Sequence, residues 1–95
     1  MQAYALLSAR FARLGALGDA AGLLHWDRQT LMPDGAAGMR AEQLAQLAVI
    51  GHEILTAPET GDLIARSRDE APGLGPWEQA NLREMRRAYL HAAAV

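Results

Sequence analysis

A helical pattern occupies the first third of the sequence and ends at a proline. Apolar side chains recur there every three or four residues, the spacing that places them on one face of an α-helix. They are Tyr4, Leu7, Phe11, Leu14, Ala21 and Leu24, with Leu6 and Leu17 broadening the stripe. Pro33 disfavours helical geometry in the residue before it, and Pro33-Asp34-Gly35 is typical of a turn. The pattern predicts one long helix to about Thr30, followed by a reversal of the chain.

Small residues interrupt the middle of this first helix. Each glycine inside a helix costs about 1 kcal/mol relative to alanine, so three of them need another purpose. The small residues concerned are Gly15, Gly18 and Gly22, together with Ala12, Ala16, Ala20 and Ala21. They form a surface against which another helix could pack closely.

A second helix is expected from Asp34 or Gly35 to about Leu55. Its predicted buried face consists of Leu44, Leu47, Ala48, Gly51, Ile54 and Leu55. The next segment, Thr56-Ala57-Pro58-Glu59, has threonine at the cap position, proline in the first turn and glutamate three residues after the threonine. This arrangement predicts a capping box at the start of a third helix.

The third helix is expected to be short and to contain Leu63 and Ile64, with Asp62 and Arg66 spaced for an ion pair. Prolines and glycines then predict a loop over residues 70–76. A last helix should start at Pro76 or Trp77. Its apolar residues are Trp77, Leu82, Met85, Ala88 and Tyr89. With no strand pattern, the prediction is an all-α domain over residues 1–95, with about four helices and the first two antiparallel.

Composition limits the classes of function open to the chain. Of its 95 residues, 51% are apolar but only 5% are aromatic, and the many alanines predict helices with thin packing. The net charge of −2, with both signs mixed, argues against a nucleic-acid interface. The absence of cysteine excludes disulfides and thiolate metal sites. No membrane span or secretory signal is evident, so we expect a soluble cytoplasmic protein.

One segment invites comparison with zinc peptidases. Their H-E-x-x-H helix binds zinc through two histidines one turn apart, and the glutamate activates water. Here His52-Glu53-Ile54-Leu55-Thr56 has threonine where the second histidine would stand. Adjacent residues also point to different sides of a helix. We therefore expect His52 and Glu53 to lie on a solvated helix face.

The stretch from His25 to Pro33 gathers an imidazole, an indole, a carboxylate and a hydroxyl. On a helix, the i,i+2 spacing of His25 and Asp27 keeps their side chains apart, which argues against a shared acid–base or metal role. The preferred interpretation is structural: Trp26 anchors the helix end in the core, and Asp27 or Thr30 bonds to the backbone or to an arginine such as Arg40.

The remaining polar residues suggest no site. His91 is isolated near the end of the sequence, and no two carboxylates among Glu42, Glu53, Glu78 and Glu84 are paired by their spacing. The basic group of Arg83, Arg86 and Arg87 is typical of a solvated face. We predict no catalytic, cofactor-binding or metal-binding residue in this chain.

Several segments nevertheless resemble the N-terminal region of the carboxypeptidase Taq family. They are Leu23-Leu24-His25-Trp26-Asp27 with Thr30, Met32, Pro33 and Gly35; Arg40-Ala41-Glu42-Gln43-Leu44-Ala45; the segment from His52-Glu53 to Thr56-Ala57-Pro58; and Trp77 to Arg87. The resemblance spans essentially all 95 residues, with its spacing kept.

The resemblance implies a part of a larger, mostly helical and usually homodimeric zinc metallocarboxypeptidase. Members remove C-terminal residues from peptides, and their zinc motif lies downstream of the region represented here. No catalytic or metal residue can therefore be carried over, zinc belongs to the full-length family, and these helices are implied to act as a scaffold or lid. The uncapped end at Ala94-Val95 also suggests a fragment. The alternative is a stand-alone helical module that self-associates through exposed apolar faces.

Overall fold

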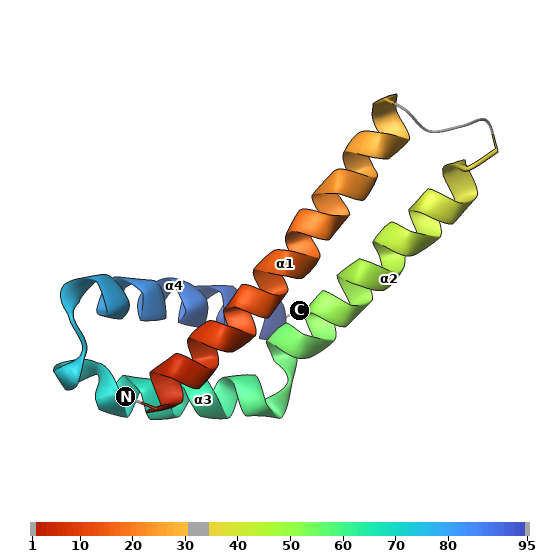
Figure 1. Cartoon of the computed structure of the whole chain (residues 1–95). Coiled ribbons are helices and arrows are strands. Elements are labelled where there is room, and N and C mark those ends of the chain that lie inside the picture. Colours follow the sequence, from red (N-terminus) through yellow and green to blue (C-terminus); the bar gives the residue numbers. More distant parts are fainter. Residues whose placement is uncertain (1, 31–34, 95) are drawn as a thin grey trace.

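The computed structural model describes residues 2–30 and 35–94, and the side chains of residues 28–30 lie outside the description. In chain order, its helices are α1 (Gln2–Thr30), α2 (Ala37–Thr56), α3 (Pro58–Glu70), the short 3-10 helix η1 (Ala71–Gly73) and α4 (Pro76–Ala93). Figure 1 labels the four α-helices. The described residues contain no strand, which confirms the all-α prediction. The predicted turn is described only from Gly35 onward, and Gly35 has the positive φ of 86° that suits glycine.

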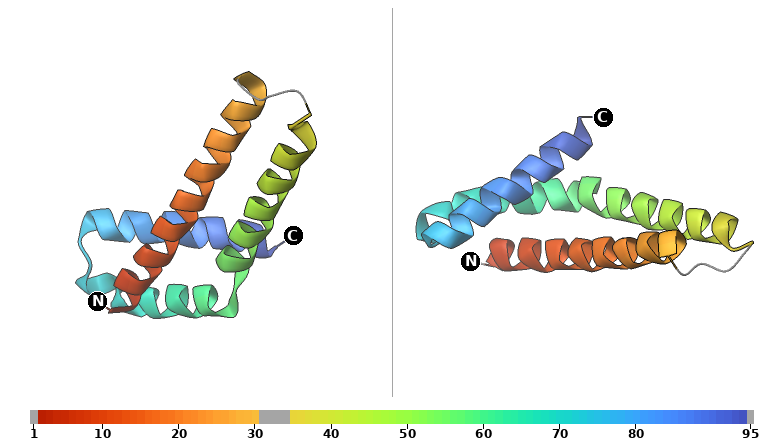
Figure 2. Two further views of the ribbon diagram at one scale, coloured as in Figure 1. Left: turned by 45° about the vertical axis from the view of Figure 1, so that its right-hand side comes forward. Right: turned by 90° about the horizontal axis from the view of Figure 1, so that it is seen from above.

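The molecule has a compact base and a projecting arm. The base contains the first turns of α1 together with α3, η1 and α4, while the arm is the rest of α1 running antiparallel to α2 (Figures 1 and 2). The chain measures 55 × 24 × 18 Å, and its radius of gyration of 16.3 Å exceeds the roughly 13 Å of a compact domain of about 100 residues. The arm therefore makes the molecule elongated.

The hydrophobic core lies in the base. Its buried apolar residues are Ala3, Leu7, Leu63, Ile64, Leu82 and Met85. Three helices supply these side chains, so each one is covered from several directions. Tyr4, Phe11 and Tyr89 pack partly buried against this cluster. Two of the apolar residues of α4 lie outside the core: Trp77 is 78% exposed and Ala88 is also exposed.

The arm has no comparable core. Within α2, all of which the structure describes, no residue is fully buried: the predicted face is half-buried and Ala48 is exposed. α1 is the main described neighbour of α2, with smaller contacts from α3 and α4, so α2 is covered mostly along the stripe that faces α1. A Cβ added at Gly15, Gly18 or Gly22 would meet no described atom within 4 Å beyond the neighbouring backbone of α1, so no other described helix packs closely against these glycines.

The junction between α2 and α3 differs from the predicted capping box. Thr56 is the last residue of α2, and its hydroxyl donates to the His52 carbonyl at 2.7 Å instead of capping α3. The cap residue is Ala57, which makes no side-chain cap bond, although Pro58 does begin α3 as expected. The prediction was wrong because the threonine hydroxyl bonds backward to the carbonyl four residues earlier, a common alternative for this side chain.

Thr60 connects three helices at this junction. It is fully buried, and its hydroxyl donates to the Ile54 carbonyl of α2 at 2.7 Å. The same oxygen accepts a bond of 3.4 Å from Nη1 of Arg10 on α1. Farther along α3, the predicted pair of Arg66 and Asp62 is present at 3.7 Å and is exposed.

Glu70, at the end of α3, caps the beginning of α1. Its carboxylate accepts hydrogen bonds from the backbone amides of Ala3 at 2.9 Å and Tyr4 at 3.0 Å. The first amides of a helix lack partners within the helix and carry partial positive charge, so an anionic acceptor is favourable there. The amide bonds, first from Tyr4 and then from Ala3, lower the pKa of the Glu70 carboxyl below its ordinary value.

The segment predicted as a loop is more ordered than expected. Glu70 belongs to α3, and Ala71–Gly73 forms the 3-10 turn. The side-chain amide of Gln79 on α4 donates to the carbonyls of Ala71 at 2.7 Å and Leu74 at 3.1 Å. These bonds hold the connection against the first turns of α4. No described helix has the length and apolarity needed to cross a membrane.

Candidate functional site

The far end of the arm carries the stretch that first suggested chemistry. Nε of Arg40 lies 2.7 Å from Oδ2 of Asp27, and Nη1 of Arg40 donates to Oε1 of Gln43 at 3.1 Å. This confirms the predicted pairing of Asp27 with an arginine. Both partners are partly buried, and the pair joins the end of α1 to the start of α2. Its role in this structure is to hold the two helices of the arm together.

Trp26 does not anchor the helix end in the core, as we had predicted. The indole is 56% exposed, because the core lies at the opposite end of α1 and, among the described helices, α2 is the one that runs beside this part of the arm. His25, next to it, is also exposed. The side chain of Thr30, the other residue expected to bond here, lies outside the described residues.

The structure does not bring the histidines together. His25 lies on α1, His52 on α2 and His91 on α4, and all three are exposed. Within the described part of the chain, no group of three His, Asp or Glu side chains is arranged to hold a metal ion. The described residues therefore do not fit a zinc site, and no catalytic step through zinc can be derived from them.

The remaining candidates are also dispersed. Glu42 and Glu53 lie on α2, whereas Glu78 and Glu84 lie on α4. Glu42 accepts a bond from Gln46 at 2.9 Å. His52 and Glu53 are exposed as predicted.

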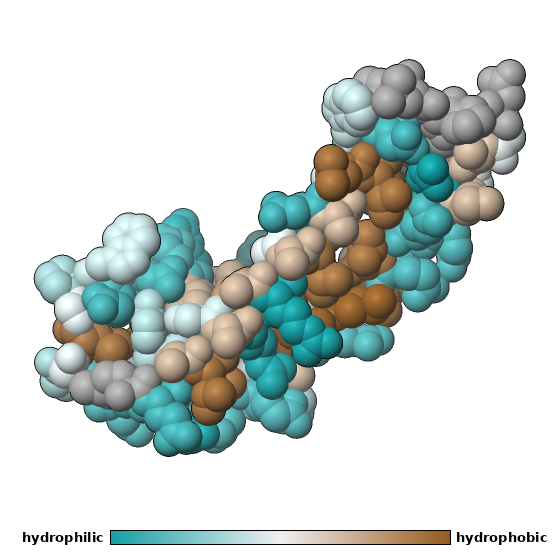
Figure 3. Space-filling view, viewed as in Figure 1, coloured by the Kyte–Doolittle hydropathy of each residue, from teal (hydrophilic) through white to brown (hydrophobic). Residues whose placement is uncertain are grey.

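An apolar groove runs between the two helices of the arm. This arm groove encloses about 520 Å³, and its walls include Leu14, Leu17 and Gly18 of α1 and Leu44, Leu47 and Leu55 of α2. Figure 3 shows apolar side chains gathered along the arm on one face of the molecule. Several large apolar side chains of the arm are exposed as well: Leu23, Trp26, Met39, Val49 and Ile50. Extended apolar surface of this kind is typical of a face that another protein segment covers.

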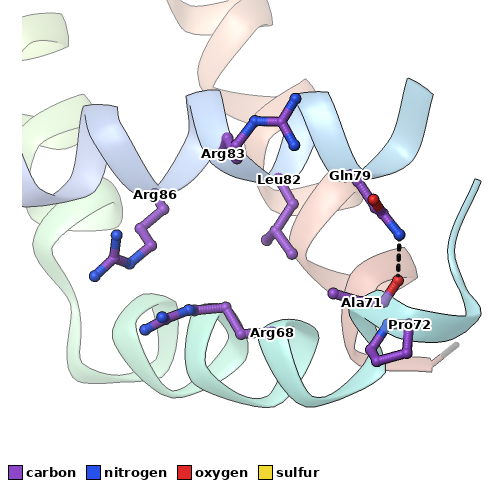
Figure 4. Close-up of a pocket in the computed structure, with 7 residues that line it drawn as sticks. All are labelled: Arg68, Ala71, Pro72, Gln79, Leu82, Arg83 and Arg86. Atoms are coloured by element: carbon purple, nitrogen blue, oxygen red, sulfur yellow. Dashed lines mark hydrogen bonds between the residues drawn. The ribbon is translucent and has the colours of Figure 1, made fainter. Parts of the chain in front are cut away.

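A second hollow, of about 700 Å³, lies in the base between α3 and α4 (Figure 4). Three arginines line it, Arg68 from α3 and Arg83 and Arg86 from α4, above an apolar floor that includes Leu82. We call it the arginine pocket. The sequence had grouped Arg83 and Arg86 with Arg87 on a solvated face. The structure separates Arg87, which pairs with Glu84 at 3.5 Å, and adds Arg68 from the facing helix.

Comparison with known proteins connects this fold to a family of peptidases. The family model of the carboxypeptidase Taq (M32) metallopeptidases matches residues 6–95. Thermostable carboxypeptidase 1 of Thermus thermophilus is 33% identical over 90 residues, which are 93% of this chain and 16% of that protein. The structure of metallocarboxypeptidase 1 of Trypanosoma cruzi matches 100% of this chain and 19% of its own, with a TM-score of 0.96 and 33% identity. This chain thus spans less than a fifth of either relative, and it belongs to the carboxypeptidase Taq (M32) metallopeptidase family, corresponding to its N-terminal region.

Proposed function

We propose that this chain is the N-terminal helical scaffold, or lid, of a zinc-dependent metallocarboxypeptidase that removes C-terminal residues from peptides. The observation that carries the proposal is the match to the Trypanosoma cruzi metallocarboxypeptidase, with a TM-score of 0.96 over the whole chain but only 19% of that protein. In this proposal the zinc ligands and the reacting groups belong to the rest of the enzyme.

The arm supports a lid role for two reasons. It projects from the packed base, so it can reach across a neighbouring surface (Figure 2). It also carries the arm groove, whose walls are apolar. Covering such walls with another surface removes them from water, which stabilises the complex by about 25 cal/mol per Å² of apolar area buried. We propose that the rest of the enzyme covers this groove.

Activity measurements test whether the reacting groups belong to the rest of the enzyme and not to this chain. Purified chain with added zinc or cobalt should not hydrolyse a blocked dipeptide above background. Mixing it with the Thermus enzyme lacking the matched segment should increase hydrolysis by that enzyme. Reproducible turnover by the chain alone would contradict the proposal.

A matched pair of variants sharpens the mixing experiment. Leu47→Asp places a charge on the wall of the arm groove, whereas Leu90→Asp places one at an exposed position of α4. The first variant should abolish the increase in hydrolysis, and the second should retain most of it. Equal loss in both variants would argue against the arm groove as the contact surface.

A second proposal concerns partners. We propose that the isolated chain self-associates through the exposed apolar face of the arm, in agreement with the alternative of an interaction module. Leu23, Met39 and Ile50 support this proposal because all three are large, apolar and exposed. Sedimentation should show an average mass that rises with concentration, and Leu47→Asp should suppress the rise. A monomer at all concentrations would exclude self-association.

We also propose a cytoplasmic location, which rests on the sequence pattern rather than on the fold. Cell fractionation of the tagged protein provides the test. Recovery in the cytoplasmic fraction is the expected result, and recovery outside the cell would contradict it.

A further inference from the structure

The arginine pocket brings together arginines from two helices without a described carboxylate partner. Three other arginines form ion pairs: Arg40 with Asp27, Arg66 with Asp62 and Arg87 with Glu84. Among the described residues, no carboxylate pairs with Arg68, Arg83 or Arg86, although all three line one hollow. Like charges brought together without a counter-ion repel one another, so the pocket has a positive potential in a chain whose net charge is −2.

The geometry places the charges on opposite walls. Figure 4 shows Arg86 extending from α4 toward α3, and Arg68 lying along the α3 side of the gap. The Arg83 guanidinium extends away from α3 in the same view. Arg83 lies one helical turn from Arg86 on α4 and lines the same pocket. A ligand between the helices could therefore receive hydrogen bonds from both walls.

The frame around these side chains is fixed. Leu82 is buried in the core, and Gln79 bonds the carbonyls of Ala71 and Leu74, which holds η1 against α4. Ala71, Pro72 and Leu82 supply an apolar floor. A volume of about 700 Å³ falls in the usual range for small-molecule sites and exceeds what one inorganic ion fills.

We propose that the arginine pocket binds a small polyanion that carries at least two carboxylate or phosphate groups, held between Arg68 and Arg86. The guanidinium fork binds the two oxygens of a carboxylate or phosphate in parallel, which favours these groups over spherical anions. A single exposed ion pair contributes little in water. A ligand with two or more anionic groups is therefore needed to engage both walls and bind at useful concentrations.

Calorimetric titration of the chain at low ionic strength tests the proposal with two probes, citrate and inorganic pyrophosphate. Saturable binding of one probe per chain is expected, and the tighter probe identifies carboxylate or phosphate as the favoured group. Acetate and chloride should bind far more weakly because each engages only one guanidinium. Failure of both probes to bind at about 10 mM would overturn the proposal, since a weaker site would be dominated by general ionic screening.

Neighbouring arginines provide matched controls. Arg68→Gln and Arg86→Gln should each weaken binding at least about tenfold, the size expected when a charge-assisted hydrogen bond is lost. Arg66→Gln and Arg87→Gln remove the same charge from the same two helices but lie outside the pocket, and they should keep the affinity within about twofold of the unsubstituted chain. Equal weakening in all four variants would overturn the proposal in favour of a net-charge effect.

Thermal denaturation gives a second readout that does not depend on heat of binding. A ligand that binds only the folded chain raises its melting temperature. Citrate or pyrophosphate, whichever binds, should therefore stabilise the Arg66→Gln and Arg87→Gln variants but not the Arg68→Gln or Arg86→Gln variants. Stabilisation of all four to the same extent would contradict a site in the pocket. The arginine pocket plays no part in the proposed scaffold role, so either proposal can fail without the other.

Discussion

The two ends of α1 have the same backbone structure but very different surroundings. Leu7, in the base, is fully buried because α3 and α4 cover it, whereas Leu23, in the arm, is 71% exposed. Both leucines belong to one uninterrupted helix. Helical periodicity alone therefore does not determine which apolar side chains are buried. The number of helices around a position determines whether its stripe becomes core or surface.

Leu7→Ala and Leu23→Ala measure this difference most directly. Removing the buried leucine should lower the free energy of unfolding by about 2–5 kcal/mol, since it leaves a cavity. The same change at exposed Leu23 should stay within about 0.5 kcal/mol. Urea denaturation followed by circular dichroism gives both values. Similar losses at the two positions would mean that the arm is covered in solution.

A second pair compares two threonines with different hydrogen bonds. Thr60→Val keeps the buried shape but removes the hydroxyl bond to the Ile54 carbonyl, which retains only the 3.4 Å bond from the Ala57 amide, and this loss should cost about 0.5–1.5 kcal/mol. Thr56→Val removes an exposed bond to the His52 carbonyl, which water can replace, and should cost about 0.5 kcal/mol or less. The same denaturation experiment applies. A larger loss at Thr56 would indicate that the hydroxyl of that residue supports the junction.

The Glu70 cap makes the stability of the base depend on pH. The pKa of Glu70 is lowered in the folded chain, so its contribution is fully present above the ordinary glutamate pKa of 4.5 and is lost as pH falls through the lowered value. Glu70→Gln should reduce the dependence of the melting temperature on pH between pH 6 and pH 3. Asp69→Asn, an exposed neighbour, should leave that dependence largely intact. Identical pH profiles for the two variants would argue against the cap.

Glycine substitutions should have opposite effects in the two regions. Gly18→Ala adds a methyl group where no described atom lies within 4 Å, and it should stabilise the arm by about 0.5–1 kcal/mol. The Cβ of Gly61→Ala would lie 2.6 Å from Oη of Tyr89. Movement of that partly buried ring should cancel or exceed the helix-propensity gain. Differential scanning calorimetry should show a higher melting temperature for Gly18→Ala and an unchanged or lower one for Gly61→Ala. Equal stabilisation of the two variants would indicate that Tyr89 moves freely.

Much of the fold could be predicted because it depends on local sequence. Apolar spacing located the helices, Pro33 and Gly35 indicated the reversal, and the i,i+4 spacing of Asp62 and Arg66 indicated their ion pair. These features depend on residues close together along the chain. How many helices surround a given position cannot be read from local sequence, and for this reason Trp26 was wrongly expected in the core.

Two features that the sequence did not indicate depend on distant segments. Arg68 joins Arg83 and Arg86 only once α3 lies beside α4. Glu70 reaches the start of α1 across a separation of 67 residues, and no local signal pairs them. A polar residue next to a proline-rich turn is ordinarily solvated. Its partner becomes evident only when the ends of two helices meet.

The Glu70 cap also links the dynamics of the two ends of the base. Amide hydrogens in the first turn of a helix normally exchange with solvent as fast as a frayed end allows, but those of Ala3 and Tyr4 are held by a carboxylate on α3. Their exchange should slow only while α3 is docked, whatever the state of the arm. The exchange rates of those two amide hydrogens therefore report whether the end of α3 is in contact with the start of α1.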